Sequence, residues 1–444
     1  MSNANHTNHT NHISQNNRRV VVTGMGIVAP NAHGLQAYEA ALRAGESGIR
    51  FIPRLEELKF ACRVGGVPEG LIEKAPEYFR EDELLSMNEN MIYGGIAAID
   101  AWRDAGLEVP DSGDDRVDVD TGAIVGLGMS GMDVIANRVV PLVGQGRVRR
   151  LGGTVVEQVM ASSVSAKLAG TFALGNEVTT NSSACNTGTE ALVLAYQRIK
   201  DGYANRMIAG SVEGSDPHMW GGFDSMRVLS SAFNEDPARA SRPLSASAGG
   251  FVPGSGAGIL ILEDLESALR RGVSRIYGEI IGGAVNSGGH RQGGSMTAPN
   301  CTAVQNCIRL ALARSGVAAG DLDAINGHLT GTFADPFEIE NWALALGVEP
   351  DRLPPINSTK SLIGHGLGAA GSQESVAALL QLSRGFLHAS LNCEDLHERI
   401  EPYAVSIVRE TREQRLRTIA KASFGFGDVN GCVVFRRFDL HEQN

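Results

Sequence analysis

Three residues of the chain are candidates for catalysis by a nucleophilic thiol: Cys185, His328 and His365. Cys185 follows an extended stretch and precedes Asn-Thr-Gly-Thr-Glu-Ala-Leu, which predicts the first turn of an apolar helix. The positive end of a helix dipole and its unpaired N–H groups favour the thiolate, which is the nucleophilic form of cysteine. From position alone, a buried and inert cysteine is the commoner alternative.

The two histidines lie in segments rich in glycine and threonine, away from charged surface sequence. His328 ends an expected strand in DLDAINGHLTGT, and His365 lies in NSTKSLIGHGLGAAG, five residues after Lys360. Junctions of strands with loops and helices are where α/β folds place ligands. A role in a site therefore explains the two histidines better than a structural role, whereas Lys360 by itself also fits a solvated lysine.

A glycine-rich segment, KASFGFGDVNGC, precedes the last expected strand. Gly425 and Gly427 flank Phe426 in this segment. One interpretation is a tight turn. The other is a flexible loop whose backbone N–H faces a reacting carbonyl and whose phenylalanine moves aside. The residues alone leave both interpretations open.

The elements that have to position these residues alternate between strands and helices. The segment RVVVTGMGIVAP predicts a strand that leads into a helix over Leu35–Ala44, and the same pattern returns at 121–131, 178–202, 205–214 and 256–272. After Arg275 we expect a strand in RIYGEIIGGAVN, helices over Ala303–Ser315, Pro336–Leu346 and 364–383, a strand in DAINGHLTGT, and closing strands in AVSIVRE and NGCVVFRRF. This alternation predicts an α/β protein with a buried, largely parallel sheet, in two similar halves that meet near 263–275.

Composition narrows the functional class. The 444 residues are 43% hydrophobic and 20% charged, which indicates a globular protein with a large core. The net charge of −11 argues against a nucleic-acid partner. The longest stretch without a charged residue, between Arg242 and Glu263, is interrupted by proline and glycine, so no membrane span is expected.

The first residues of the chain and its cysteines indicate the cellular compartment. Residues 1–18 repeat Asn-His-Thr, which predicts a disordered polar tail without the apolar core of a signal peptide. We therefore expect a cytoplasmic protein whose six cysteines are reduced. No CxxC pair occurs, so a thiolate metal site is not indicated.

A series of motifs resembles one known family. In chain order they are VVVTGMG, ACNTG around Cys185, RASRP, GAG at 256–258, NGHLTGT, NSTKSLIGHGLGAAG and SFGFG. Together, and over about Arg19 to Arg437, they resemble the β-ketoacyl-acyl-carrier-protein synthases of the elongating type. They are also similar to the ketosynthase α subunits of type II polyketide synthases. Each motif is weak alone, but their order and spacing make the resemblance specific.

The resemblance implies a thiolase-type fold, in which two duplicated halves form five α-β-α-β-α layers. The expected parts are the tail at 1–18, an N-terminal half at 19–265 with the nucleophilic cysteine, and a C-terminal half at 266–444 with both histidines. The implied activity is an acyltransferase reaction: decarboxylative Claisen condensation of an acyl thioester on Cys185 with malonyl-acyl-carrier-protein. The implied partners are an acyl carrier protein and either a second copy or a related ketosynthase-like subunit, with no metal and no redox cofactor.

The resemblance also implies roles for individual residues. Cys185 would be acylated, His328, His365 and Lys360 would serve the condensation, and the backbone N–H groups of Cys185 and Phe426 would form an oxyanion hole. The other implied roles are phosphopantetheine binding by Thr330 and Thr332, an acyl pocket or gate formed by Met129, Phe223 and Phe426, a polar network that includes Glu374, and carrier docking at Arg147, Arg149, Arg150 and Arg227.

The chain also departs from the family pattern. In the loop after the first histidine, Leu329 replaces the usual glycine, Gly331 replaces the usual serine, and one residue is missing before Asp335. Ser255 replaces an acidic residue, and Asp428 replaces the second glycine after the gating phenylalanine. The stretch before Phe251, which is usually charged, reads LSASAGG. A basic helix usual after residue 75 is replaced by 77–89, with five acidic residues and Arg80. No reacting group is lost, and the altered loops favour specialised polyketide or polyene synthesis over housekeeping fatty-acid elongation.

Two other classes remain as alternatives. A catalytically silent subunit, similar to the chain-length factors that pair with ketosynthases, would lack the nucleophile, whereas Cys185 is present. A degradative thiolase would use a second cysteine at the third site position, where this chain has His365.

Overall fold

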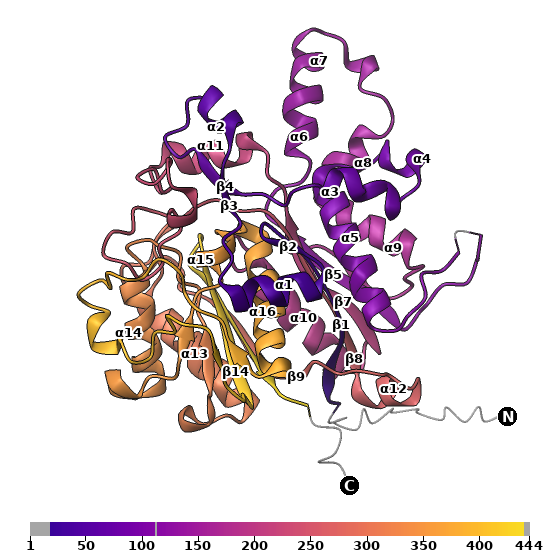
Figure 1. Ribbon diagram of the computed structural model, residues 1–444. Helices are drawn as coiled ribbons and strands as arrows, with labels where there is room; N and C mark the ends of the chain where they lie inside the picture. Colours follow the sequence, from indigo (N-terminus) through magenta and orange to yellow (C-terminus); the bar gives the residue numbers. More distant parts are fainter. Residues whose placement is uncertain (1–17, 112, 439–444) are drawn as a thin grey trace, which may run out of the picture.

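One mixed sheet organises the computed structural model, which describes residues 18–111 and 113–438 (Figure 1). The expected disordered tail lies outside these residues, apart from Arg18. The strands of the sheet are β1 (Val20–Ala29), β2 (Ala32–His33), β5 (Thr121–Leu127), β6 (Val178–Thr179), β7 (Arg206–Glu213), β8 (Gly256–Asp264), β9 (Gly278–Ser287), β10 (Ala324–Asn326), β11 (Ile356–Asn357), β14 (Thr418–Gly425) and β15 (Val429–Arg436). Two small pairs accompany it: β3 (Ile49–Phe51) with β4 (Val64–Gly66), and β12 (Phe386–Leu387) with β13 (Arg412–Glu413).

Helices surround and divide this sheet. The longer ones are α1 (Leu35–Ala44), α5 (Glu89–Asp104), α9 (Ser163–Thr171), α10 (Thr187–Lys200), α11 (Pro217–Ser225), α13 (Cys301–Ser315), α14 (Asp335–Leu346) and α16 (Ala370–Arg384). The shorter ones are α2 (Pro53–Glu57), α3 (Leu71–Lys74), α4 (Glu81–Leu84), α6 (Met132–Val134), α7 (Val140–Gly144), α8 (Val155–Val159), α12 (Leu265–Arg270) and α15 (Lys360–Ile363). No helix of the described part of the chain is both long and apolar enough to cross a membrane.

The order of the strands repeats. The first half runs β6-β5-β7-β8-β1 across the sheet, and the second half runs β11-β10-β14-β15-β9. In chain order, each half thus places its third, second, fourth, fifth and first strand side by side. The two halves meet where β1 pairs antiparallel with β9. The expected duplicated architecture is confirmed, while the division at residues 265 and 266 stays a prediction.

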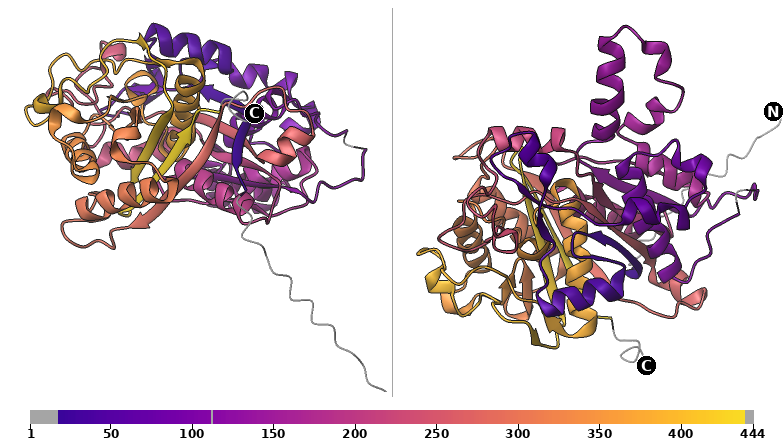
Figure 2. Two further views of the ribbon diagram at one scale, coloured as in Figure 1. Left: turned by 90° about the horizontal axis from the view of Figure 1, so that it is seen from below. Right: turned by 45° about the horizontal axis from the view of Figure 1, so that its top comes forward.

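Helices α10 and α16 lie between the two half-sheets and contact strands of both. Helices α5 and α9 cover the outer face of the first half, and α13 and α14 cover that of the second (Figure 2). This gives the five expected layers. A Cβ added at Gly188 of α10 would lie 2.4 Å from the backbone nitrogen of Ser372 in α16, and one added at Gly371 would lie 2.5 Å from that of Thr189. Glycine at both positions therefore lets the two central helices touch through their backbones.

The sheet is mixed, which corrects the expectation of a largely parallel one. Parallel pairing is confined to β6-β5-β7 and β11-β10-β14, whereas β1, β8, β9 and β15 pair antiparallel with their neighbours. Strands covered on both faces carry continuous apolar runs in either direction of pairing. The sequence pattern could therefore detect the strands without showing how their neighbours run.

The expected strand in AVSIVRE is wrong. Residues 401–403 form one turn of 3₁₀ helix, and only an isolated bridge joins Ile407 to Ile356. Ile407 and Val408 are buried as parts of a loop, which explains their apolar character. The strand of this region is β14 instead, paired along its length with β15. The expected helix at 364–383 begins only at Ala370, after a 3₁₀ turn at Leu367–Ala369.

Candidate active site

Cys185 lies in a sharp bend between β6 and α10. The preceding residue, Ala184, has a φ of 50°, in the left-handed region that residues with a side chain rarely adopt. The hydroxyl of Thr187 holds this bend, because it accepts the N–H of Ser183 at 2.8 Å and donates to the carbonyl of Ala184 at 2.7 Å. The sequence predicted the helix start but not the strained residue that turns the thiol toward the second half.

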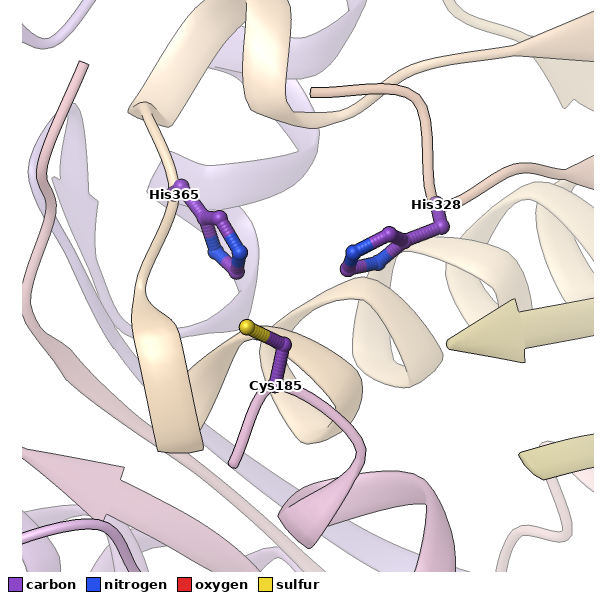
Figure 3. Close-up of side chains that lie close together, drawn as sticks. All are labelled: Cys185, His328 and His365. Carbon is purple, nitrogen blue, oxygen red and sulfur yellow. The ribbon is translucent and has the colours of Figure 1, made fainter. Parts of the chain in front are cut away.

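Both histidines come from loops of the second half. His328 lies between β10 and α14. We expected the strand to end at His328, but β10 ends two residues before it, at Asn326. His365 lies between α15 and α16. Both rings point at the Cys185 thiol, which lies between them (Figure 3). The sulfur and one nitrogen of each ring lie within 4.8 Å of one another. The ring centroids are 5.4 Å apart, with Phe251 packed on the edge of His365 at 5.1 Å.

Hydrogen bonds orient the two rings in the same way. The N–H of Leu367 donates to Nδ1 of His365 at 3.1 Å, and the Lys360 ammonium donates to Nδ1 of His328 at 3.3 Å. Since Nδ1 is the acceptor in both rings, these bonds assign the proton of each neutral imidazole to Nε2. Burial, reinforced by the Lys360 and Lys421 cations, holds the pKa of both histidines well below 6.5. Both rings are therefore neutral hydrogen-bond donors at pH 7.

A buried ion cluster supports the histidines from behind. Glu374 of α16 contacts the ammonium of Lys360 and, at 2.8 Å, that of Lys421. Lys360 also donates to the carbonyl of His328 at 2.6 Å. All three charged side chains are buried, and burial lowers the pKa of Lys421. Sequence reasoning included Lys360 and Glu374 but missed Lys421, whose signal is a lysine within an otherwise apolar strand.

The three side chains that were expected to react are also of types that can bind a metal ion. Within the described ranges, Cys185, His328 and His365 are the one group of three or more His, Cys, Asp or Glu side chains close enough to hold a metal ion. The Lys360 and Lys421 cations near the rings disfavour a further positive charge there.

The thiol itself is more basic than the sequence suggested. Burial raises the pKa of Cys185 to about 11, although Lys360 and the backbone N–H groups of Phe426 and of Cys185 itself act in the opposite direction. Loss of hydration thus outweighs the helix start, from which a lowered pKa was expected. The resting sulfur is therefore a protonated thiol. The backbone N–H groups of Phe426 and Cys185, which were expected to form an oxyanion hole, are close enough to the sulfur to lower its pKa.

Family models match most of the chain. The model described as "Beta-ketoacyl synthase, N-terminal domain" matches residues 17–268, and "Beta-ketoacyl synthase, C-terminal domain" matches residues 277–394. The chain belongs to the β-ketoacyl synthase family. A similar relative is 3-oxoacyl-[acyl-carrier-protein] synthase 1 of Haemophilus influenzae, 34% identical over 95% of this chain and 100% of that protein.

Two solved structures resemble this β-ketoacyl synthase over nearly the whole chain. "The ishigamide ketosynthase/chain length factor" has a TM-score of 0.85 and 27% identity, and it covers 95% of this chain and 100% of its own. A type II polyketide synthase acyl-carrier protein in complex with its ketosynthase has a TM-score of 0.84 and 26% identity, with the same coverage.

A cavity of about 560 Å³ leads to Cys185 in this β-ketoacyl synthase. Its walls include most of the residues that the resemblance singled out: both histidines, Thr330, Thr332, Phe223, Phe426 and Arg227. The hydroxyls of Thr330 and Thr332 are hydrogen-bonded at 2.9 Å, and the rings of Phe223 and Phe426 lie 6.1 Å apart.

Met129 does not reach this cavity. It is 45% exposed and lines a separate small depression with Glu89 and Met132. The reason is local: the N–H groups of Gly128 and Met129 donate to Glu213 directly after β5 ends, and this fixes the direction of the chain. Within one chain, the expected acyl-pocket position of Met129 is therefore not found.

The arginines expected to dock a carrier are in two places. Arg147, Arg149 and Arg150 lie in and beside a 3₁₀ turn at Val148–Arg150, in the segment after α7 that projects from the body of the protein (Figures 1 and 2). None of the three lines the cavity, whereas Arg227 does. The acidic segment at 77–89 contains the short helix α4 and ends at the first residue of α5, and its Glu83 forms an ion pair with Lys167 at 2.7 Å.

Sequence reasoning missed two buried carboxylates beneath the histidine loop. Glu338 accepts the N–H of His328 at 2.6 Å and that of Leu329 at 2.7 Å. Asp335 accepts the N–H groups of Thr330 and Gly331 at 2.8 and 3.0 Å. Burial raises the pKa of both carboxyls. The signal was available as two acidic residues in the first turn of the helix that follows His328.

The family departures fit their surroundings. Leu329 is fully buried in the apolar core of the second half. Gly331 has a φ of 78° and its carbonyl accepts the N–H of Gly250, within the altered LSASAGG segment. Ser255 is buried and donates to the carbonyl of Gly66 at 3.3 Å. None of these side chains replaces a group that contacts the thiol.

Proposed function

We propose that this β-ketoacyl synthase accepts an acyl chain on Cys185 and condenses it with malonyl-acyl-carrier-protein. The products are carbon dioxide and a β-ketoacyl chain on the carrier, two carbons longer than the acyl chain. One observation carries the proposal: a thiol faces two neutral imidazoles, with all three reactive atoms within 4.8 Å.

In the first step the sulfur of Cys185 attacks the acyl thioester. The Sγ–C bond forms, the bond from the acyl carbon to the carrier's sulfur breaks, and the thiol proton passes to the departing carrier thiol. The tetrahedral oxyanion would be bound by the backbone N–H groups of Cys185 and Phe426. Removal of one such donor typically costs about 2.7–4 kcal/mol of transition-state stabilisation.

In the second step malonyl-carrier loses carbon dioxide beside the histidines. The electron pair of the broken C–C bond forms an enolate, whose oxygen would accept hydrogen bonds from the Nε2–H groups of His328 and His365. The enolate carbon attacks the acyl carbon, the C–Sγ bond breaks, and the Cys185 thiolate takes up one proton. Neutral imidazoles can donate here without two buried positive charges.

Lys360 and Glu374 act in this proposal as positioning residues. Lys360 occupies Nδ1 of His328, so the ring can present only Nε2–H to the substrate. Glu374 forms an ion pair with each of Lys360 and Lys421 and so offsets one of their two positive charges, which would otherwise be unpaired in the interior. Thr330 and Thr332, on the cavity wall, would bind the phosphopantetheine arm.

Mass spectrometry of the intact protein tests the proposal. Acyl-carrier should add the mass of one acyl group, mapped to the peptide of Cys185, and later malonyl-carrier should remove it with release of carbon dioxide. An acyl group on Cys301 or Cys432, or a decarboxylation that yields no longer chain, would contradict it.

The partners belong to the same proposal. We infer an acyl carrier protein as substrate donor and a dimer, either of two copies or with a related subunit. The ishigamide ketosynthase/chain length factor supports the second form and specialised synthesis, while the relative named 3-oxoacyl-[acyl-carrier-protein] synthase 1 supports elongation of fatty acids. Six free cysteines fit the inferred cytoplasmic location. Kinetics with a fatty-acid carrier protein and with a carrier protein encoded beside this gene would distinguish the two pathways. Faster condensation with the second carrier would favour specialised synthesis.

A further inference from the structure

We propose that Asn341 of α14 is a specificity residue of the cavity, whose NH₂ group donates a hydrogen bond to an oxygen atom of the bound acyl chain. The preferred substrate is therefore a chain that keeps oxygen along its length, and not a fully saturated one. The proposal rests on the function proposed above, because it names the class of acyl chain that Cys185 receives.

Asn341 belongs to the face of α14 that forms one wall of the cavity. Phe337, Glu338 and Asn341 line the cavity together, at the spacing of neighbours on one helix face. Glu338 also accepts the N–H of His328. Asn341 thus lies one helical turn beyond the residue that anchors the histidine loop.

The cavity wall has an exposed part and a buried part. Phe333 lines the cavity and is 68% exposed, whereas Asn341 is only 3% exposed and Val304 of α13, also on the wall, is buried. The arm of a carrier protein has to enter from the exposed part to reach Cys185. The buried part, which contains Asn341, is therefore where the acyl chain extends out of contact with water.

Neighbouring side chains determine which way the Asn341 amide faces. Arg309 has only donors, and its Nη2 donates to Oε1 of Gln305 at 3.3 Å. Gln305 therefore turns its Nε2 toward Asn341 and donates to Oδ1 at 2.9 Å. Within the described ranges this is the only hydrogen bond of the Asn341 side chain, so its acceptor is occupied and its NH₂ group is unpaired.

An unpaired NH₂ group makes this wall selective. A saturated chain that covers Asn341 would remove the group from water without offering it an acceptor, which is costly. A carbonyl or hydroxyl oxygen of the chain would accept its hydrogen bond instead. Sites built to hydrogen-bond a substrate discriminate strongly against an analogue that lacks the polar group.

The proposed reaction itself produces chains of this kind. Each condensation leaves a carbonyl group on the β-carbon, so a chain that is not fully reduced between rounds carries oxygen on alternate carbons. The reactions that act on the product between condensations must then leave a ketone in place, or reduce it only as far as a hydroxyl.

Asn341→Leu tests the hydrogen bond, since leucine has a similar size but no donor. Acylation of Cys185 is compared for carriers that bear saturated, oxo and hydroxy chains of equal length, with the oxygen at alternate carbons. The unaltered protein should prefer an oxygen-bearing chain by about 10-fold, and the variant should lose this preference. Asn306→Leu, at an exposed position of α13 outside the cavity, is the control and should keep it.

Gln305→Glu tests the orientation without altering Asn341. An ionised carboxylate only accepts, so one oxygen pairs with Arg309 and the other accepts from the Asn341 NH₂ group, which turns Oδ1 toward the cavity. A hydroxyl can donate to this oxygen, whereas a ketone cannot. The ratio of hydroxy to oxo acylation should therefore rise by about 5-fold or more. Thermal unfolding verifies that each variant is folded, and an unchanged ratio in folded Gln305→Glu would contradict the proposal.

The remaining outcomes separate this proposal from the proposed function. An equal loss for saturated and oxygen-bearing chains in Asn341→Leu would assign its donor to an amide carbonyl of the carrier's arm and overturn the proposal. Equal acylation by both kinds of chain in the unaltered protein would also overturn it, and both results leave the function standing. If no carrier acylates Cys185, the proposed function fails. Equilibrium binding of acyl-pantetheine analogues with an amide in place of the thioester then still decides whether Asn341 selects oxygen-bearing chains.

Discussion

The loops that follow β5 and β10 occupy equivalent places in the two halves and are held in the same way. After β5, Glu213 accepts the successive N–H groups of Gly128 and Met129, and after β10, Glu338 accepts those of His328 and Leu329. Among these four anchored residues, only His328 has a side chain that can transfer a proton or donate a hydrogen bond. Each loop is thus anchored by a buried carboxylate, which comes from the end of β7 in the first half and from α14 in the second, and the side chain presented by the loop also differs.

The loops before the two central helices extend the comparison. Cys185 precedes α10 in the first half, and His365 precedes α16 in the second. The close contact of these helices at Gly188 and Gly371 brings the two loops together. The first half supplies the proposed nucleophile, and the second supplies both imidazoles with their buried charges, so neither half holds the whole of the proposed site.

Removing the nucleophile should have the largest effect. Cys185→Ala should abolish self-acylation and lower condensation by about 10³-fold or more. Cys301→Ala is the control, because Cys301, the first residue of α13, also lies at the start of a helix but is not in the group formed by the histidines. Acyl transfer and product formation are measured separately. Equal losses of acyl transfer in both variants would mean that a position at a helix start is enough to make a thiol reactive, without the histidines of the second half.

Removing either imidazole should affect the second step most. His328→Ala and His365→Ala should lower decarboxylation and condensation by about 10²–10⁴-fold, with a smaller effect on acylation of Cys185, because the backbone N–H donors remain. Self-acylation is followed by intact mass and carbon dioxide release by a separate assay. Loss of acylation with normal decarboxylation would reverse the roles assigned to the halves.

The two anchoring glutamates allow a matched comparison. Glu338→Gln should lower kcat by about 10-fold, because one N–H of the His328 loop loses its acceptor and the ring is displaced. Glu213→Gln makes the same change in the loop after β5, which has no histidine. Because Glu213 also accepts the N–H of Gly368 at 3.0 Å, three residues after His365, we expect a smaller loss of kcat, about twofold to threefold. Similar losses of kcat in both would show that anchoring matters for the whole fold and not for the histidine.

Glu213 also predicts a pH dependence of stability. Burial raises the pKa of Glu213 from 4.5 to about 7 in the folded protein. The folded state therefore binds more protons than the unfolded chain between these values, and the free energy of unfolding falls as pH rises through that window. Thermal unfolding from pH 4.5 to 7 should show a shallower fall for Glu213→Gln. An unchanged slope would contradict the raised pKa.

The smallest effect is expected at the projecting arginines. Simultaneous charge reversal of Arg147, Arg149 and Arg150 should raise the carrier's KM roughly 5-fold and weaken its salt dependence, since attraction between exposed charges acts mainly on encounter. A small carrier-free thioester should still acylate Cys185 normally. Reversal of Arg227, which lines the cavity, serves as the comparison. An unchanged KM in the triple variant would contradict docking at the projecting arginines and would favour docking of the carrier at Arg227, beside the cavity.

The reacting groups could be found from the sequence because their signals are local. Cys185 stands at a helix start, and the histidines lie in glycine-rich motifs whose order along the chain is specific. The helices over 35–44 and 301–315 follow from apolar spacing within ten to fifteen residues. Local order also indicated the duplicated halves, since the alternation of strands and helices restarts after Arg275.

The features that only the tertiary structure shows depend on contacts between residues far apart in the chain. The direction of pairing in the sheet, the place of Met129 outside the cavity, and the basic pKa of Cys185 follow from packing against distant segments. Lys421 lies 47 residues after Glu374 in sequence yet bonds to it, and Asp428 accepts an N–H from His290, 138 residues before it. Residue types and short-range spacing carry no record of such contacts, because burial and hydrogen bonding arise only when the chain has closed on itself.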